Sequence, residues 1–250
     1  MNQLLRPFQK TKEKSKATDS SATNSRVCPW LTRLAYPLGR KIVLPFYFSD
    51  IEVRGQENVP QTGPVILAPT HRSRWDALLI PYATGRCVTG RDLRFMVSSD
   101  EVIGVQGWFI KRLGGFAVDT RRPTISSLRH GVELLQQGEM VVIFPEGNIY
   151  RGKEISKLKC GLARLALQAQ TSQPDINVKV LPISLDYEQA YPSRGCSVKI
   201  DIGTPLDVAH YQSASTKKAA KSLIKDLETA LVNLTEPLSQ PSPPPLALIG

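Results

Sequence analysis

The chain has 250 residues, of which 41% are hydrophobic, and this is enough for one domain with a sizeable core. Its 32 Lys and Arg against 22 Asp and Glu give a formal net charge of +10, which favours an anionic partner such as a membrane surface or a phosphate-bearing substrate. The sequence shows neither the motifs of nucleic-acid-binding modules nor the paired cysteines of a zinc site. We therefore expect reduced structural thiols, no metal and no nucleic-acid partner.

The two ends of the chain differ in composition from its middle. Residues 1–26 are rich in Ser, Thr and Lys, which predicts a disordered basic tail. The same composition fits a transit peptide, so import into an organelle stays open. Residues 236–250 contain a Pro-rich run and predict a second disordered tail.

Residues 27–49 combine large apolar side chains with Arg33, Arg40 and Lys41. This mixture is typical of a helix that lies in the headgroup region of an anionic membrane. A core helix broken at Pro37 fits the same residues. No stretch of the chain reaches the roughly 20 apolar residues needed to span a bilayer.

Residues 50–235 alternate between strand-like and helical patterns. Apolar runs at 64–68, 95–97, 116–118, 140–144, 178–184 and 197–202 predict strands. Apolar residues recur at helical spacing at 125–135, 158–169 and 220–234. This alternation predicts a single α/β domain, a sandwich with a largely parallel or mixed central sheet. In such sheets, ligands bind at the carboxyl ends of the strands.

His71 and Asp76 stand five residues apart, between the apolar run 64–68 and an apolar segment that begins at Ala77. A helix turns about 100° per residue, so two side chains five apart on one helix point about 140° away from each other. The pair can meet if His71 lies in the turn after the strand and Asp76 in the first turn of the next helix. The imidazole could then accept the proton of an alcohol while the carboxylate orients it. A purely structural hydrogen bond fits the same spacing.

A second polar feature, Pro145-Glu146-Gly147, ends the apolar run 140–144. Pro145 cannot continue a central ladder, and Gly147 allows a backbone conformation that other residues resist. Glu146 is either a solvated turn residue or a hydrogen-bond acceptor in a cleft.

Together these segments resemble the glycerolipid acyltransferases, the family of 1-acylglycerol-3-phosphate and lysophospholipid acyltransferases. Four blocks follow the family order: His71 to Asp76, Gly114 to Arg121, Phe144 to Gly147, and Val180 to Ile183. The resemblance covers residues 50–235. The chain departs from the family pattern in three places: Thr70 replaces Asn, Thr120 precedes Arg121 and Arg122, and Asn148-Ile149 replaces Thr-Arg.

The resemblance implies transfer of an acyl chain from coenzyme A or acyl carrier protein to the hydroxyl of a lysophospholipid, such as 1-acylglycerol-3-phosphate, without a cofactor. His71 would be the general base and Asp76 would orient it. The residues expected to bind substrate are Glu146, Gly147, Arg74, Arg121, Arg122 and Arg151. The resemblance also favours membrane contact for residues 27–49, and therefore a peripheral or monotopic protein at the cytoplasmic face.

Other functions fit the same residues. The site could remodel or transacylate lipids with another acceptor, or the chain could be a catalytically weak, peripheral membrane-binding member of the fold. A hydrolase that uses Ser73 is disfavoured because no Gly-x-Ser-x-Gly elbow surrounds this residue. We expect a turn or cap role for Ser73.

Overall fold

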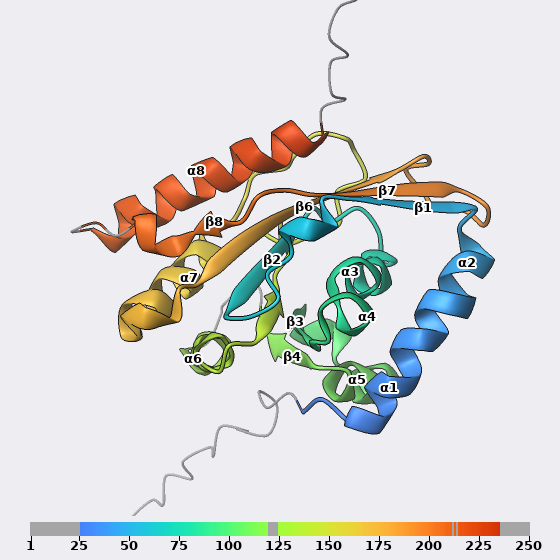
Figure 1. Ribbon diagram of the computed structural model, residues 1–250, viewed down its shortest axis with the longest axis horizontal. Coiled ribbons are helices and arrows are strands. Elements are labelled where there is room, and N and C mark those ends of the chain that lie inside the picture. Colours follow the sequence, from blue (N-terminus) through green and yellow to red (C-terminus); the bar gives the residue numbers. More distant parts are fainter. Residues whose placement is uncertain (1–25, 120–124, 212, 214, 236–250) are drawn as a thin grey trace, which may run out of the picture.

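The computed structural model describes residues 26–119, 125–211, 213 and 215–235 (Figure 1). The predicted disordered tails, apart from Arg26, and the candidate residues Arg121 and Arg122 lie outside these ranges.

The described strands form one mixed sheet, in the order β1-β7-β6-β2-β5-β3-β4 with β8 paired to β6. Their bounds are β1 Asp50–Arg54, β2 Val65–Pro69, β3 Leu93–Ser98, β4 Gly115–Val118, β5 Met140–Val142, β6 Lys179–Tyr187, β7 Ser197–Ile202 and β8 Leu206–Asp207. The five strands β6, β2, β5, β3 and β4 run parallel to their neighbours in that order. Strand β7 is antiparallel to β6, and β1 is parallel to β7. The predicted α/β class with a mixed sheet is therefore confirmed.

Helices cover both faces of this sheet (Figure 1). The longer ones after the first strand are α3 Asp76–Thr84, α5 Gly104–Arg112, α6 Ile125–Gln136, α7 Gly161–Ser172 and α8 Thr216–Thr235. Short helical segments are η2 Gln56–Asn58, α4 Arg86–Thr89, η3 Ser99–Glu101, η4 Pro174–Ile176 and η5 Val208–Tyr211. In β2, Ile66 and Ala68 pack into the core beneath α6, α7 and α8, whereas Val65 and Leu67 pack into the core beneath α3 and residues 44–48. The two cores follow from the period of two in a strand.

The N-terminal part of the described chain is one helix in three segments, α1 Pro29–Leu38, the π-helical η1 Gly39–Val43 and α2 Leu44–Tyr47. It runs through Pro37 without ending there. Five large apolar side chains at every fourth position are 45–64% exposed, and we call them the apolar stripe: Trp30, Leu34, Leu38, Ile42 and Phe46. The helix predicted over 27–49 is present, and its contact with a membrane stays a prediction. No described helix is long and apolar enough to cross a bilayer.

Several predicted boundaries are wrong by two residues or more. The strand predicted over 140–144 ends at Val142, because Phe144 leaves the sheet and stacks against His71. The helical pattern predicted from 158 begins as a helix only at Gly161, and Leu158 is a buried residue before it. Strand β1 and helix α5 were not predicted. The fourth block lies in β6, where Val180 and Ile183 are fully buried and belong to the core.

Candidate active site

The carboxyl end of β2 positions the first polar block. The Thr70 amide donates to the carbonyl of Ile183 on β6 at 2.9 Å, and the Thr70 Oγ1 accepts from the amide of Leu185 at 2.9 Å. These bonds continue the β2–β6 pairing for one residue beyond the strand and fix the start of the turn. His71 therefore leaves the sheet edge in a defined direction, and α3 begins at Asp76. The predicted placement of His71 before the helix and Asp76 in its first turn is confirmed.

Asp76 is fully buried and accepts hydrogen bonds at both carboxylate oxygens. Its Oδ2 lies 2.8 Å from His71 Nδ1 and accepts from the backbone amides of Arg72 at 2.7 Å and Ser73 at 2.9 Å. Its Oδ1 accepts from the hydroxyl of Tyr187 at 2.6 Å. A carboxylate can only accept, so His71 Nδ1 carries the proton in this pair and Nε2 is left as the basic nitrogen.

Tyr187 reaches this carboxylate from the end of β6. Burial raises the pKa of Tyr187 well above its ordinary value, and the negative charge of Asp76 raises it further. The phenol therefore stays protonated and continues to donate to Asp76 across the physiological pH range. Nothing in the local sequence indicates this partner, because it stands 111 residues after Asp76.

Glu146 is buried and binds within the protein. Its two oxygens accept from Arg72 Nη1 at 3.0 and 2.8 Å. One oxygen also accepts from the His71 amide at 3.0 Å, and the other from the Ser156 amide at 2.9 Å. The arginine that Glu146 binds is therefore Arg72, whose side chain is 7% exposed and which was not among the arginines expected from the sequence. This pair ties the third block to the first.

The imidazole of His71 is also held from one side by an aromatic ring. It stacks on Phe144 with ring centroids 3.9 Å apart, and the His71 side chain stays 20% exposed. Gly147 follows with a positive φ of 77°, and a Cβ at this position would collide with the Lys159 side chain. The positive φ favours glycine at position 147, whereas the contact is with the flexible end of the Lys159 side chain, which can move aside. Ser73 has the expected turn role, since its Oγ accepts from the Trp75 amide at 3.3 Å.

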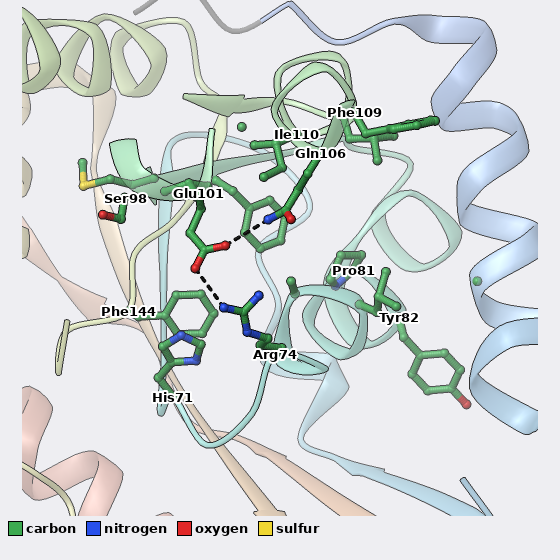
Figure 2. A pocket seen from close by; sticks show the side chains of 18 of the residues that line it. His71, Arg74, Pro81, Tyr82, Ser98, Glu101, Gln106, Phe109, Ile110 and Phe144 are labelled. Carbon is green, nitrogen blue, oxygen red and sulfur yellow. Dashed lines mark hydrogen bonds and ion pairs between the residues drawn. The ribbon is translucent and has the colours of Figure 1, made fainter. Parts of the chain in front are cut away.

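A cavity of about 930 Å³ opens at His71 (Figure 2). Its volume lies at the upper end of the range for small-molecule sites. The polar end holds His71, Arg74, Arg151 and Gly147, and the walls are largely apolar, with side chains from α3 and α5 that include Leu78, Pro81, Phe109 and Ile110. The shape and lining fit a reactive polar group near His71 and an apolar chain behind it.

Two of the four arginines expected to bind substrate lie at the cavity, and the other two are outside the described residues. Arg74 and Arg151 both line the cavity. The Arg74 side chain is 76% exposed and pairs with Glu101 at 3.1 Å, while the Arg151 guanidinium lies 4.6 Å from the ring centroid of Tyr191. Neither Arg121 nor Arg122 belongs to the described residues. Contact of any of these side chains with a substrate stays a prediction.

Comparison with known proteins identifies the class. A family model described as Acyltransferase matches residues 50–186, more than half of the chain. The chain therefore belongs to the acyltransferase family. It is similar in structure to the crystal structure of the 1-acyl-sn-glycerophosphate (LPA) acyltransferase from Thermotoga maritima, with a TM-score of 0.61 and 20% identity over 85% of this chain and 83% of that one. This likeness shows the fold.

Relatives among curated proteins carry two kinds of name. The 1-acyl-sn-glycerol-3-phosphate acyltransferase of Bacillus subtilis is 28% identical over 200 residues, 74% of this chain and 92% of the relative. That of Pseudomonas aeruginosa is 27% identical over 175 residues, 68% of this chain and 58% of the relative. Glycerol-3-phosphate O-acyltransferase 1 of Saccharomyces cerevisiae is 30% identical over 109 residues, 41% of this chain but only 14% of the relative. The chain thus matches a minor part of some relatives and nearly all of another.

Proposed function

We propose that the protein transfers a fatty acyl chain from a thioester, on coenzyme A or acyl carrier protein, to the free hydroxyl of 1-acylglycerol-3-phosphate, which gives phosphatidic acid. The observation that carries this proposal is the buried Asp76 carboxylate bound to His71 Nδ1 at the mouth of a largely apolar cavity. Family membership and the names of the relatives from B. subtilis and P. aeruginosa support the reaction and the acceptor.

In this mechanism His71 Nε2 accepts the proton of the acceptor hydroxyl as that oxygen attacks the thioester carbonyl. The carbonyl oxygen becomes an oxyanion, and the tetrahedral intermediate then expels the thiolate to leave an ester. The imidazolium returns its proton to the thiolate, so the products are the ester and the free thiol. Asp76 orients the ring and stabilises its positive charge, and the Tyr187 hydroxyl keeps Asp76 in place. No covalent acyl-enzyme is required.

The hydrogen bonds of Asp76 exclude two backbone amides as donors to the oxyanion. Backbone amides near the start of α3 are natural candidates, because a helix begins with amides that have no partner within the helix. The amides of Arg72 and Ser73 already donate to Asp76 Oδ2, so they are not available for the oxyanion. Their role is to fix the carboxylate that positions His71.

A second candidate acceptor is glycerol-3-phosphate. The relatives from S. cerevisiae and Mus musculus are named glycerol-3-phosphate acyltransferases, the latter 25% identical over 202 residues. Both acceptors bear a phosphate close to the reacting hydroxyl, and a guanidinium suits that group. The cavity contributes Arg74 and Arg151 for this purpose.

The test is an assay of the purified full chain with labelled palmitoyl-CoA or palmitoyl-acyl carrier protein. Acceptors are 1-acylglycerol-3-phosphate, glycerol-3-phosphate and lysophosphatidylcholine. We expect esterification of 1-acylglycerol-3-phosphate, and a loss of about 10²- to 10⁴-fold in His71→Ala with the fold intact by circular dichroism. Turnover of glycerol-3-phosphate alone would favour the second acceptor. Undiminished turnover in His71→Ala would refute the mechanism.

We also propose that the N-terminal helix contacts an anionic membrane through the apolar stripe. Basic residues flank the stripe, including the exposed Arg33 and Lys41. Helix α5 and the residue before it add exposed apolar side chains, among them Val105 at 75% and Ile103 at 70% exposure. The Cys28 amide donates to the Arg112 carbonyl at 2.8 Å, which joins the start of α1 to the end of α5 (Figure 1). Apolar insertion with basic flanks is the pattern of interfacial helices.

Sedimentation with anionic vesicles tests this contact. Replacement of Trp30 and Ile42 by Ser should reduce the bound fraction at least tenfold, because both side chains are largely exposed in the free protein. Val232→Ser changes an exposed apolar residue of α8 and is the matched control. Equal binding of both variants would exclude the stripe as the contact.

A further inference from the structure

Three polar side chains form a connected row across the polar end of the cavity (Figure 2). Arg74 Nη2 donates to Glu101 Oε1 at 3.1 Å, and Gln106 Nε2 donates to Glu101 Oε2 at 2.9 Å. Arg74 belongs to the turn that carries His71, Glu101 ends η3, and Gln106 lies on α5. All three line the same cavity as His71.

The negative charge of Glu101 differs from the positive charges of the other charged side chains that line the cavity. Among the cavity-lining residues in the described part of the chain, Glu101 is the sole carboxylate. The other charged side chains there are basic, and their contacts differ. Arg40 Nη1 donates to the Tyr82 carbonyl at 2.8 Å, and Arg151 stacks on Tyr191. A carboxylate repels an anionic ligand, so Glu101 opposes the binding of a phosphate in the cavity that also contains His71.

The pair of Arg74 and Glu101 is also easy to separate. Their side chains are 76% and 41% exposed, and an ion pair this exposed contributes little to stability. A phosphate carries more charge than a carboxylate and offers three acceptor oxygens, so it competes well for a guanidinium. Arg74 can therefore exchange one anion for the other without disturbing the fold.

We propose that Glu101 sets the affinity for the acceptor, because it occupies Arg74 until the phosphate of the acceptor displaces it. This inference rests on the proposed function, because it assigns the anion to a phosphate-bearing acceptor. The acceptor phosphate lies one carbon away from the reacting hydroxyl of 1-acylglycerol-3-phosphate, so it must come close to His71. The phosphates of a coenzyme A donor are separated from the thioester by the whole pantetheine arm. Arg74 stands three residues after His71 and lines the same cavity, so it can bind the phosphate of the acceptor.

An acceptor must therefore separate Arg74 from Glu101 before it can bind the guanidinium. A ligand without a phosphate leaves Arg74 paired with Glu101 and gains nothing from the guanidinium. A phosphate-bearing ligand gains the charge-assisted bonds, minus the energy of the pair that it breaks. Glu101 thus lowers the affinity for every anionic acceptor by a small factor, and it acts through Arg74.

The experiment measures KM for 1-oleoylglycerol-3-phosphate and for palmitoyl-CoA in the full chain. Glu101→Gln keeps a hydrogen-bond acceptor for Gln106 and removes the charge. We expect the acceptor KM to fall about two- to fivefold, the range for an exposed ion pair, and the donor KM to change less. Arg74→Ala should raise the acceptor KM about tenfold or more. In the double variant, the gain from Glu101→Gln should disappear.

Two controls make the outcomes distinct. Glu52→Gln removes another exposed, arginine-paired carboxylate, on the edge strand β1, and should leave both KM values unchanged. An unchanged acceptor KM in Glu101→Gln, or a gain that persists without Arg74, would overturn the inference. A larger effect on the donor KM would assign Arg74 to the donor and would also overturn it. If His71→Ala is inactive while Glu101→Gln has no effect, only this inference fails and the proposed function stands.

Discussion

Removal of the Glu146 carboxylate should destabilise the fold more than any other single change at the site. In Glu146→Ala the Arg72 guanidinium, 7% exposed, keeps the carbonyls of Tyr150 and Glu154 as its only partners among the described residues. An unpaired buried charge of this kind costs about 3 to 5 kcal/mol, a large part of the 5 to 15 kcal/mol that is typical for a domain. The His71 and Ser156 amides lose an acceptor in the same variant.

Urea denaturation followed by circular dichroism measures this loss. With a slope of about 3 kcal/mol per M, the midpoint should fall by about 1 to 1.7 M. Glu52→Ala, which removes half of an exposed ion pair, is the matched control and should shift the midpoint by less than about 0.3 M. The double variant Arg72→Leu with Glu146→Leu should be more stable than Glu146→Ala, because no charge is left unpaired.

The result that refutes this reasoning is an unchanged midpoint with lost activity. Glu146 would then act on the substrate, as the sequence also allowed, and not as the structural partner of Arg72. A fall in midpoint with activity retained at low temperature would support the structural role.

Three further predictions concern Asp76, Gly147 and His130. Asp76→Asn should lower kcat about 10³- to 10⁴-fold with little change in KM, because an amide no longer fixes the proton on Nδ1 of His71; a loss below tenfold would contradict the assigned tautomer. Gly147→Ala should lower the free energy of unfolding by about 1 to 3 kcal/mol in the same urea assay, because the positive φ of 77° opposes a Cβ. Burial lowers the pKa of His130 below 6.5, so stability should fall as the pH drops below 6.5, where only the unfolded chain gains this proton. His130→Gln should reduce that fall between pH 7 and pH 5, and identical pH profiles would show that His130 does not contribute.

The central pair could be predicted because both partners are local. His71 lies in the short turn between β2 and α3, and Asp76 is the first residue of α3. The end of the strand and the start of the helix therefore determine the distance between the two side chains. Tyr187 could not be predicted, because it reaches Asp76 only through the pairing of β2 with β6. That pairing depends on strand order, which residue patterns do not specify.

The same limit explains Arg72 and α5. Arg72 finds Glu146, 74 residues away, only because β5 lies next to β2 in the sheet. Helix α5 has a weak pattern, since large apolar side chains such as Val105 and Trp108 are exposed while the small Gly107 is buried. A helix whose apolar side chains face outward does not show the periodicity that predicts burial against a core.

The π-helical segment Gly39–Val43 changes what the apolar stripe can touch. In an ideal α-helix, residues four apart advance about 40° beyond a full turn, so Phe46 would stand about 160° around the axis from Trp30. A π-helix has about 4.4 residues per turn, so the same step there falls short of a full turn and takes back part of the drift. All five side chains of the stripe stay exposed as a result. The wider turn converts a spiral of large side chains into a straighter ridge along the helix, and a ridge can lie flat against a plane along its whole length.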